Sequence, residues 1–149
     1  MTTVHVEIDI AAPPERVWQT VMDPTRLRDW VTIHRSVKVK SDDPARRGAR
    51  MDQVLQILGV PFKVHWTLET VEAPRHAEWH GRGPALSRAL ISYALTATSD
   101  GGTRFEYVNE FHPPGGQLGG VASRVLIGQV PEREAHESLL RLKGVIESS

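Results

Sequence analysis

The sequence has 149 residues, with 18 basic and 18 acidic side chains and no cysteine. A chain of this length buries about 70% of its unfolded surface, so it can form a sizeable core without a disulfide framework. The lack of cysteine excludes disulfides, thiolate metal sites and thiol nucleophiles, and the balanced charge gives no net field that would draw the protein to nucleic acid or an anionic membrane.

The first predicted element is a strand that ends at Ile10. Val4, Val6, Ile8 and Ile10 alternate with polar residues, which is the period of a half-buried strand. This start lacks the basic residues and apolar run of a signal peptide, and no stretch approaches the roughly 18 apolar residues of a membrane span. We therefore expect one cytoplasmic domain, residues 1–149, that does not span a membrane.

Two short helices are predicted within residues 13–30, directly after this strand. Pro13 and Pro14 suit a first helical turn, and Asp23-Pro24 ends the first helix and caps the second. Apolar residues recur at helical spacing at Val17, Trp18, Val21 and Met22, and then at Leu27 and Trp30. Because each helix is too short to be stable alone, both must pack against a larger element.

The rest of the chain supplies that larger element. Six more strands are predicted, at residues 33–40, 51–58, 61–71, 77–82, 89–98 and 103–111. Their short connections imply antiparallel neighbours, and Asp100-Gly101 is typical of a hairpin turn. After HPPGG the apolar period becomes helical, at Leu118, Val121, Ala122 and Val125 and again at Ala135, Leu139, Leu142 and Ile146.

This order of elements and the segment APPERVWQTVMDPTRLRDW resemble the START-like superfamily (SRPBCC), in particular its polyketide cyclase/dehydrase and lipid-transport branch. The resemblance implies an α+β helix-grip fold. A seven-stranded curved antiparallel sheet would surround a long C-terminal helix that begins near residue 116, with a cavity between them. The two short helices would close the open end of the sheet, so Val17, Trp18, Val21 and Trp30 are interpreted as packing residues.

Alternation along the strands assigns the inner face of such a sheet. Phe62, Val64, Trp66 and Leu68 share one face, and the same argument turns Trp79, Ile91, Tyr93, Leu95, Phe105, Tyr107, Asn109 and Phe111 inward. Aromatic rings with a few polar tips line pockets of roughly 300 to 1,000 Å³. The predicted ligand-binding residues are Phe62, Trp66, Trp79, Tyr93, Phe105, Tyr107, Asn109, Val121 and Val125. A filled core that satisfies the tyrosine hydroxyls internally is the alternative.

Asn109 is the most informative of these residues. Its carboxamide is predicted to face inward beside Tyr107 and Phe111, and burying it without partners costs about 1 to 3 kcal/mol. Either backbone or water satisfies the group at the strand end, or Asn109 anchors an oxygen of a ligand.

No metal site or cofactor is expected from the sequence. His76 and His80 lie on one strand, where positions i and i+4 are about 13 Å apart and cannot share an ion. The alternation places His5, His34 and His65 on outer faces. The basic segment ARRGAR, residues 45–50, lacks interleaved aromatic residues and is typical of a solvated turn rather than a nucleic-acid site.

Pro131 departs from the continuous C-terminal helix that the resemblance implies. Proline inside a helix removes a backbone hydrogen bond, so a break near residues 128–131 is expected. Either Pro131 starts a new helical segment in its first turn, or the break is a hinge over the cavity.

Three functions remain open at this point. A binding or transport protein for a small hydrophobic molecule, such as a lipid or a polyketide-like compound, needs only the cavity and some anchors. A polyketide cyclase or aromatase would use the same cavity with groups that move protons, such as Tyr93 and Tyr107. A protein-interaction module is the third. The sequence assigns no catalytic residue and leaves open whether the chain is an enzyme or forms a homodimer.

Overall fold

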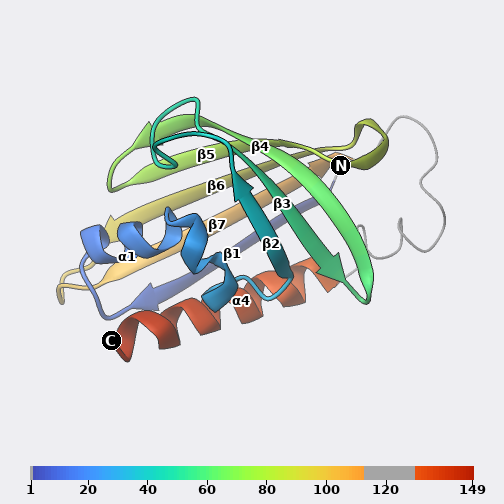
Figure 1. Ribbon diagram of the computed structural model, residues 1–149. Helices are drawn as coiled ribbons and strands as arrows, with labels where there is room; N and C mark the ends of the chain where they lie inside the picture. Colours follow the sequence, from blue (N-terminus) through green and yellow to red (C-terminus); the bar gives the residue numbers. More distant parts are fainter. Residues whose placement is uncertain (1, 113–129) are drawn as a thin grey trace.

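The computed structural model describes residues 2–112 and 130–149, and its main element is a seven-stranded antiparallel sheet (Figure 1). The strand order is β1-β7-β6-β5-β4-β3-β2, so the first and last strands of the chain are neighbours. The strands are β1 (Thr2–Ile10), β2 (His34–Val39), β3 (Arg50–Ile57), β4 (Val60–Glu72), β5 (His76–Arg82), β6 (Arg88–Ala97) and β7 (Thr103–His112).

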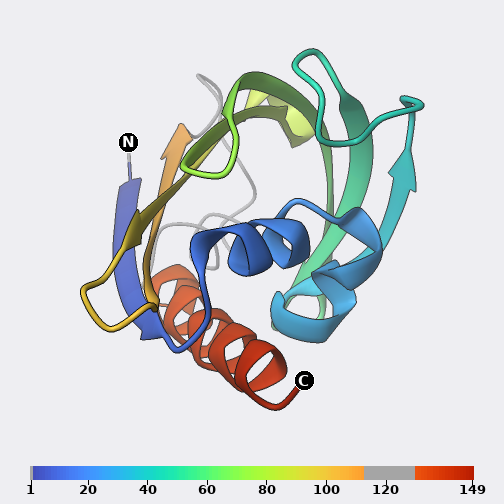
Figure 2. The same cartoon turned by 90° about the vertical axis from the view of Figure 1, so that its left-hand side faces the viewer.

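The sheet is strongly curved, and helix α4 (Val130–Glu147) lies inside the curve. Figure 2 shows α4 beside β1 and helix α1 across the open end of the sheet. The core fills the space between these layers. Its largest fully buried side chains include Ile10, Val17, Trp30, Leu68, Phe105, Leu139, Leu142 and Ile146.

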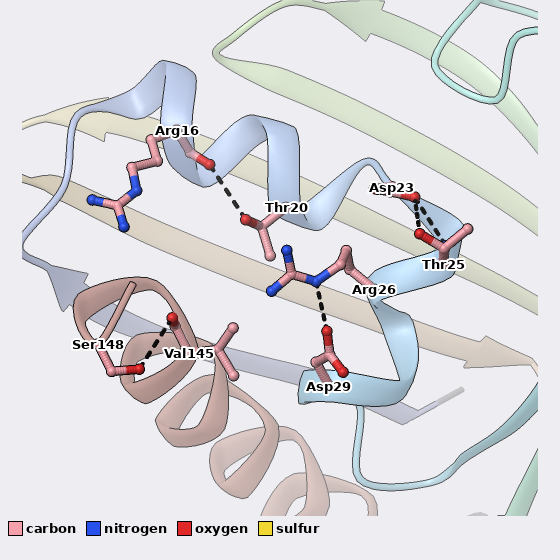
Figure 3. A network of polar contacts seen from close by, with 8 residues as sticks. All are labelled: Arg16, Thr20, Asp23, Thr25, Arg26, Asp29, Val145 and Ser148. Carbon is pink, nitrogen blue, oxygen red and sulfur yellow. Dashed lines mark hydrogen bonds and ion pairs between the residues drawn. The ribbon is translucent and has the colours of Figure 1, made fainter.

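The two short helices form as the sequence predicts, with the second divided. Helix α1 spans Pro14–Val21, and a 3₁₀ turn, η1 (Pro24–Arg26), leads into α2 (Leu27–Trp30). Oδ1 of Asp23 accepts a hydrogen bond from the amide of Thr25 at 3.0 Å, which caps the turn (Figure 3). These local polar contacts hold the segment in place while its apolar side chains pack inward.

Helix α4 places Pro131 in its first turn, where proline is compatible with a helix. The predicted helix start near residue 116, together with Val121 and Val125, lies outside the described residues. Among residues 2–112 and 130–149, no helix has the length and apolar character needed to cross a membrane. The predicted helix-grip α+β fold is confirmed by the seven-stranded curved sheet, the C-terminal helix and the short helices after β1.

Candidate functional site

A cavity of about 140 Å³ lies between the inner face of the sheet and α4. Its wall is mainly apolar and combines side chains from α2, from strands β3 to β7 and from α4. The volume is below the predicted range of roughly 300 to 1,000 Å³. It is close to that of the engineered cavity of about 150 Å³ that binds benzene in another protein.

Most of the predicted ligand-binding residues on the sheet meet at this cavity. The residues that line it are Phe62, Trp66, Trp79, Tyr93, Tyr107 and Asn109. Phe105 is fully buried, with its ring centroid 5.3 Å from that of Tyr93, and is not among the described residues of this wall. Its role in ligand binding stays a prediction.

Trp30 packs in the core as predicted and has a further role at the cavity. We interpreted it as a packing residue that closes the sheet, and it is indeed only 1% exposed, with its ring edge-on to Phe105 at 6.2 Å between centroids. It also lines the cavity, next to Tyr93. Trp30 is therefore both a core residue and part of the candidate site.

Gln53 is a buried polar residue of the cavity that the sequence analysis missed. Its Oε1 accepts a hydrogen bond from Nε1 of Trp66 at 2.9 Å, and its Nε2 lies 2.9 Å from Nδ1 of His34. These two hydrogen bonds satisfy the oxygen and the nitrogen of the Gln53 amide and the indole N–H of Trp66. Strand alternation with Met51 and Leu55 on β3 could have placed Gln53 on the inner face.

The prediction that His34 faces outward is wrong. His34 lies opposite Leu55, and the register between β2 and β3 shifts between His34 and Ser36. An extra residue at such a bulge moves the preceding side chain to the other face. Burial and, to a smaller extent, the nearby charge of Arg28 hold the pKa of His34 below its ordinary value, so this ring favours the neutral form that can accept from Gln53.

Asn109 and the two tyrosines form the polar part of the sheet wall. Nδ2 of Asn109 donates a hydrogen bond to the hydroxyl of Tyr107 at 3.2 Å, and Tyr107 lies opposite Tyr93 in the β6–β7 register. Burial raises the pKa of Tyr107 to about 12. Burial and the neighbouring Tyr107 also raise the pKa of Tyr93. Both hydroxyls therefore stay protonated at neutral pH.

Two buried polar atoms at the cavity are left without a partner. They are Oδ1 of Asn109 and Nε1 of Trp30, the two completely inaccessible side-chain nitrogen or oxygen atoms among residues 2–112 and 130–149 that have no hydrogen bond. Both residues line the cavity. The unsatisfied groups of the described structure are thus concentrated at one site.

The helix side of the cavity carries Ser138 and Glu134, which the sequence analysis did not assign. The amide of Thr32 donates to Oγ of Ser138 at 3.0 Å, and the hydroxyl of Thr32 donates to the carboxylate of Glu134. These bonds tie α4 to the loop between α2 and β2. They give Glu134 a partner within the protein and fix the helix over the sheet.

The other histidines lie away from this cavity. His65 and His80 are exposed on the outer face, next to Asp52 and Glu78. His5 is also exposed, and its ring nitrogen lies in a group with the carboxylates of Glu7 and Glu106 whose candidate ligand atoms are all within 4.8 Å of one another. The sequence analysis had not considered those carboxylates, and the absence of a metal stays a prediction.

The fold is shared by solved structures of low sequence identity. One is the TTHA0849 protein of Thermus thermophilus, with a TM-score of 0.79, 20% identity and coverage of 98% of this chain and 97% of that chain. Another is a conserved protein of Geobacillus kaustophilus, with a TM-score of 0.77, 20% identity and coverage of 99% and 96%. At this identity the likeness concerns the fold alone.

Two proteins of Mycobacterium tuberculosis are similar in sequence. Toxin Rv0910 is 29% identical over 83 residues, which cover 56% of this chain and 58% of the length of that relative. Uncharacterized protein Rv1546 is 24% identical over 135 residues, which cover 87% of this chain and 92% of that protein. The match to the first relative thus spans little more than half of its length.

A family model covers nearly the whole chain. It matches residues 1–147 and describes polyketide cyclase/dehydrase and lipid transport proteins. The match agrees with the curved sheet, the short helices after β1 and the C-terminal helix described above. The chain therefore belongs to the polyketide cyclase/dehydrase and lipid transport family.

Proposed function

We propose that this chain binds or carries a small, mainly apolar molecule in the cavity between the sheet and α4. The observation that supports the proposal is the cavity itself, about 140 Å³ with a mainly apolar wall. The atoms that line a void lose dispersion contacts, and a ligand of matching shape restores them. Membership of the polyketide cyclase/dehydrase and lipid transport family also supports the binding of a hydrophobic ligand.

The size of the cavity narrows the class of ligand. A volume near that of the engineered benzene-binding cavity suits a single ring or a short chain, whereas larger ligands use pockets of roughly 300 to 1,000 Å³. A compact molecule of one ring therefore fits the described cavity better than a multi-ring polyketide.

The protonation and hydrogen bonding of the polar side chains in the cavity favour binding over cyclase or aromatase activity. A general acid or base works best when its pKa lies near the operating pH, and burial raises the pKa of Tyr107 to about 12. Tyr107 therefore serves as a hydrogen-bonding group. Glu134, at the cavity wall, accepts a hydrogen bond from the hydroxyl of Thr32, which ties one of its oxygens to the loop between α2 and β2. No observation on the described residues favours a protein-interaction module.

Thermal unfolding with p-xylene tests the proposal. A ligand at 100 times its Kd adds about 2.7 kcal/mol to the stability of the folded state, so we expect Tm to rise by about 5 to 10 °C. Glycerol at the same concentration serves as the polar control and should leave Tm unchanged. If p-xylene does not raise Tm and calorimetry detects no binding, the proposal is wrong.

A further inference from the structure

We infer that the ligand carries a neutral hydroxyl group that donates to Oδ1 of Asn109, while Nε1 of Trp30 in the same cavity donates to an oxygen of the ligand. This inference rests on the proposed function, because it concerns the ligand of the same site. It adds a polar requirement for a ligand that the cavity otherwise selects by shape and apolar contact.

The amide orientation of Asn109 decides which kind of ligand group it can bind. Its Nδ2 is used by the hydroxyl of Tyr107 at 3.2 Å, while Oδ1 is buried without a partner among the described residues. Oδ1 can only accept a hydrogen bond. A ligand hydroxyl supplies the missing donor, whereas a ketone or an ether does not.

Trp30 provides the complementary requirement. Its indole N–H can only donate a hydrogen bond. The Trp30 side chain is only 1% exposed, and its N–H has no hydrogen-bond partner among the residues that the structure describes. The indole of Trp66, which lines the same cavity, is instead satisfied by Gln53 at 2.9 Å. The indole N–H of Trp66 is thus satisfied within the protein, whereas that of Trp30 remains for an acceptor on the ligand.

The two atoms are exceptional within the molecule. Most buried polar side chains in folded proteins have a partner, so each exception needs a physical reason. Elsewhere in the described structure, the buried hydroxyl of Thr103 donates to the carbonyl of Ala12 at 2.7 Å, and Ser138 is bonded to Thr32. Among the described residues one acceptor and one donor remain: Oδ1 of Asn109 requires a donor such as a hydroxyl, and Nε1 of Trp30 requires an acceptor such as an oxygen.

The side chains around Asn109 favour a neutral group over an anion. The charged residues that the structure describes in the cavity wall are Arg88, which is exposed, and Glu134, which accepts a hydrogen bond from Thr32. The wall beside Asn109 is formed by the rings of Tyr107 and Phe111 and by Ile91, which lies opposite Asn109 in the sheet register. The same burial that raises the pKa of Tyr107 also disfavours an ionised phenol bound beside it. A phenol-like or alicyclic alcohol of about one ring meets these conditions.

The test compares p-cresol, p-xylene and 4-methylanisole by calorimetry. p-Xylene replaces the hydroxyl of p-cresol by a methyl group of similar size, and 4-methylanisole keeps an acceptor but has no donor. The readout is the ratio of the Kd of p-xylene to that of p-cresol. In Asn109→Leu we expect this ratio to fall by about three- to tenfold, since one buried hydrogen bond is lost. p-Xylene itself should still bind.

Trp30→Phe provides a second variant that removes only the N–H and part of the ring. It should lower the affinity for both p-cresol and 4-methylanisole relative to p-xylene, because both oxygens can accept. Glu110→Gln is the matched control: Glu110 follows Asn109 on β7, is not among the described residues of the cavity wall, and should leave the ratio unchanged.

The outcomes separate the two proposals. If none of the three molecules binds, the proposed function fails. If all bind but the ratio is the same in the wild type, Asn109→Leu and Trp30→Phe, the cavity binds apolar rings and the hydroxyl inference is wrong. That second result would also be obtained if bound water satisfied the two atoms.

Discussion

Ala135→Leu is expected to weaken the binding of p-xylene and p-cresol alike, by about tenfold or more. Ala135 lies on α4 and lines the cavity, so leucine adds three carbon atoms to a space of about 140 Å³. A ring that matches the original volume then no longer fits, and each loss of about 1.4 kcal/mol lowers the affinity tenfold. Alanine and leucine both favour helices, so α4 should persist.

The control for this variant is His136→Leu, at the next residue of the same helix. His136 is exposed, and leucine there should leave both affinities unchanged. Isothermal calorimetry measures the six Kd values of the two ligands for the wild type and the two variants. Unchanged binding in Ala135→Leu would place the ligand outside this cavity.

Gly81→Ala is expected to destabilise the fold by about 1 to 3 kcal/mol, the usual cost of inserting a carbon into a packed core. Gly81 lies opposite Trp66 in the β4–β5 register, and a Cβ at this position would lie 2.6 Å from Cε3 of Trp66 and 2.7 Å from Cγ1 of Val64. The added methyl must displace the indole, which also disturbs its hydrogen bond to Gln53.

Gly144→Ala is the matched control and should raise the free energy of unfolding rather than lower it. Gly144 is exposed on α4, and nothing lies within 4 Å of a Cβ built there. Alanine in a helix is more stable than glycine by about 0.5 to 1 kcal/mol. Urea unfolding of the three proteins measures the difference, and a stability for Gly81→Ala equal to the wild type would refute the close packing of Trp66 on Gly81.

Much of the fold could be predicted because the local patterns agree with the tertiary structure. On β4, the alternation that turns Phe62, Val64, Trp66 and Leu68 inward is matched by four buried side chains. The prolines and the Asp23 cap likewise predict where the short helices begin. Short connections then restrict the strands to antiparallel neighbours, which is the observed topology.

The sequence is less informative where the direction of a side chain depends on how strands distant in the sequence pair with one another. The inward position of His34 follows from a register shift between β2 and β3, which the alternation along β2 alone does not reveal. The burial of Trp30 was predicted from its helical stripe, but its place at the cavity depends on β6 and β7, whose Tyr93 and Phe105 lie beside its ring. Gln53 is different, since the alternation of β3 was sufficient to find it.

The indole N–H signals of the four tryptophans give the most direct test of the account. Trp30, Trp66 and Trp79 line the cavity, whereas Trp18 is buried in the core and is not part of its wall. In a ¹⁵N–¹H correlation spectrum, with the signals assigned by single Trp→Phe variants, p-cresol should shift the Trp30 signal most, through a new hydrogen bond. The Trp18 signal should stay in place. A Trp30 signal that does not move while p-cresol binds, or a larger shift at Trp18, would contradict the proposed site.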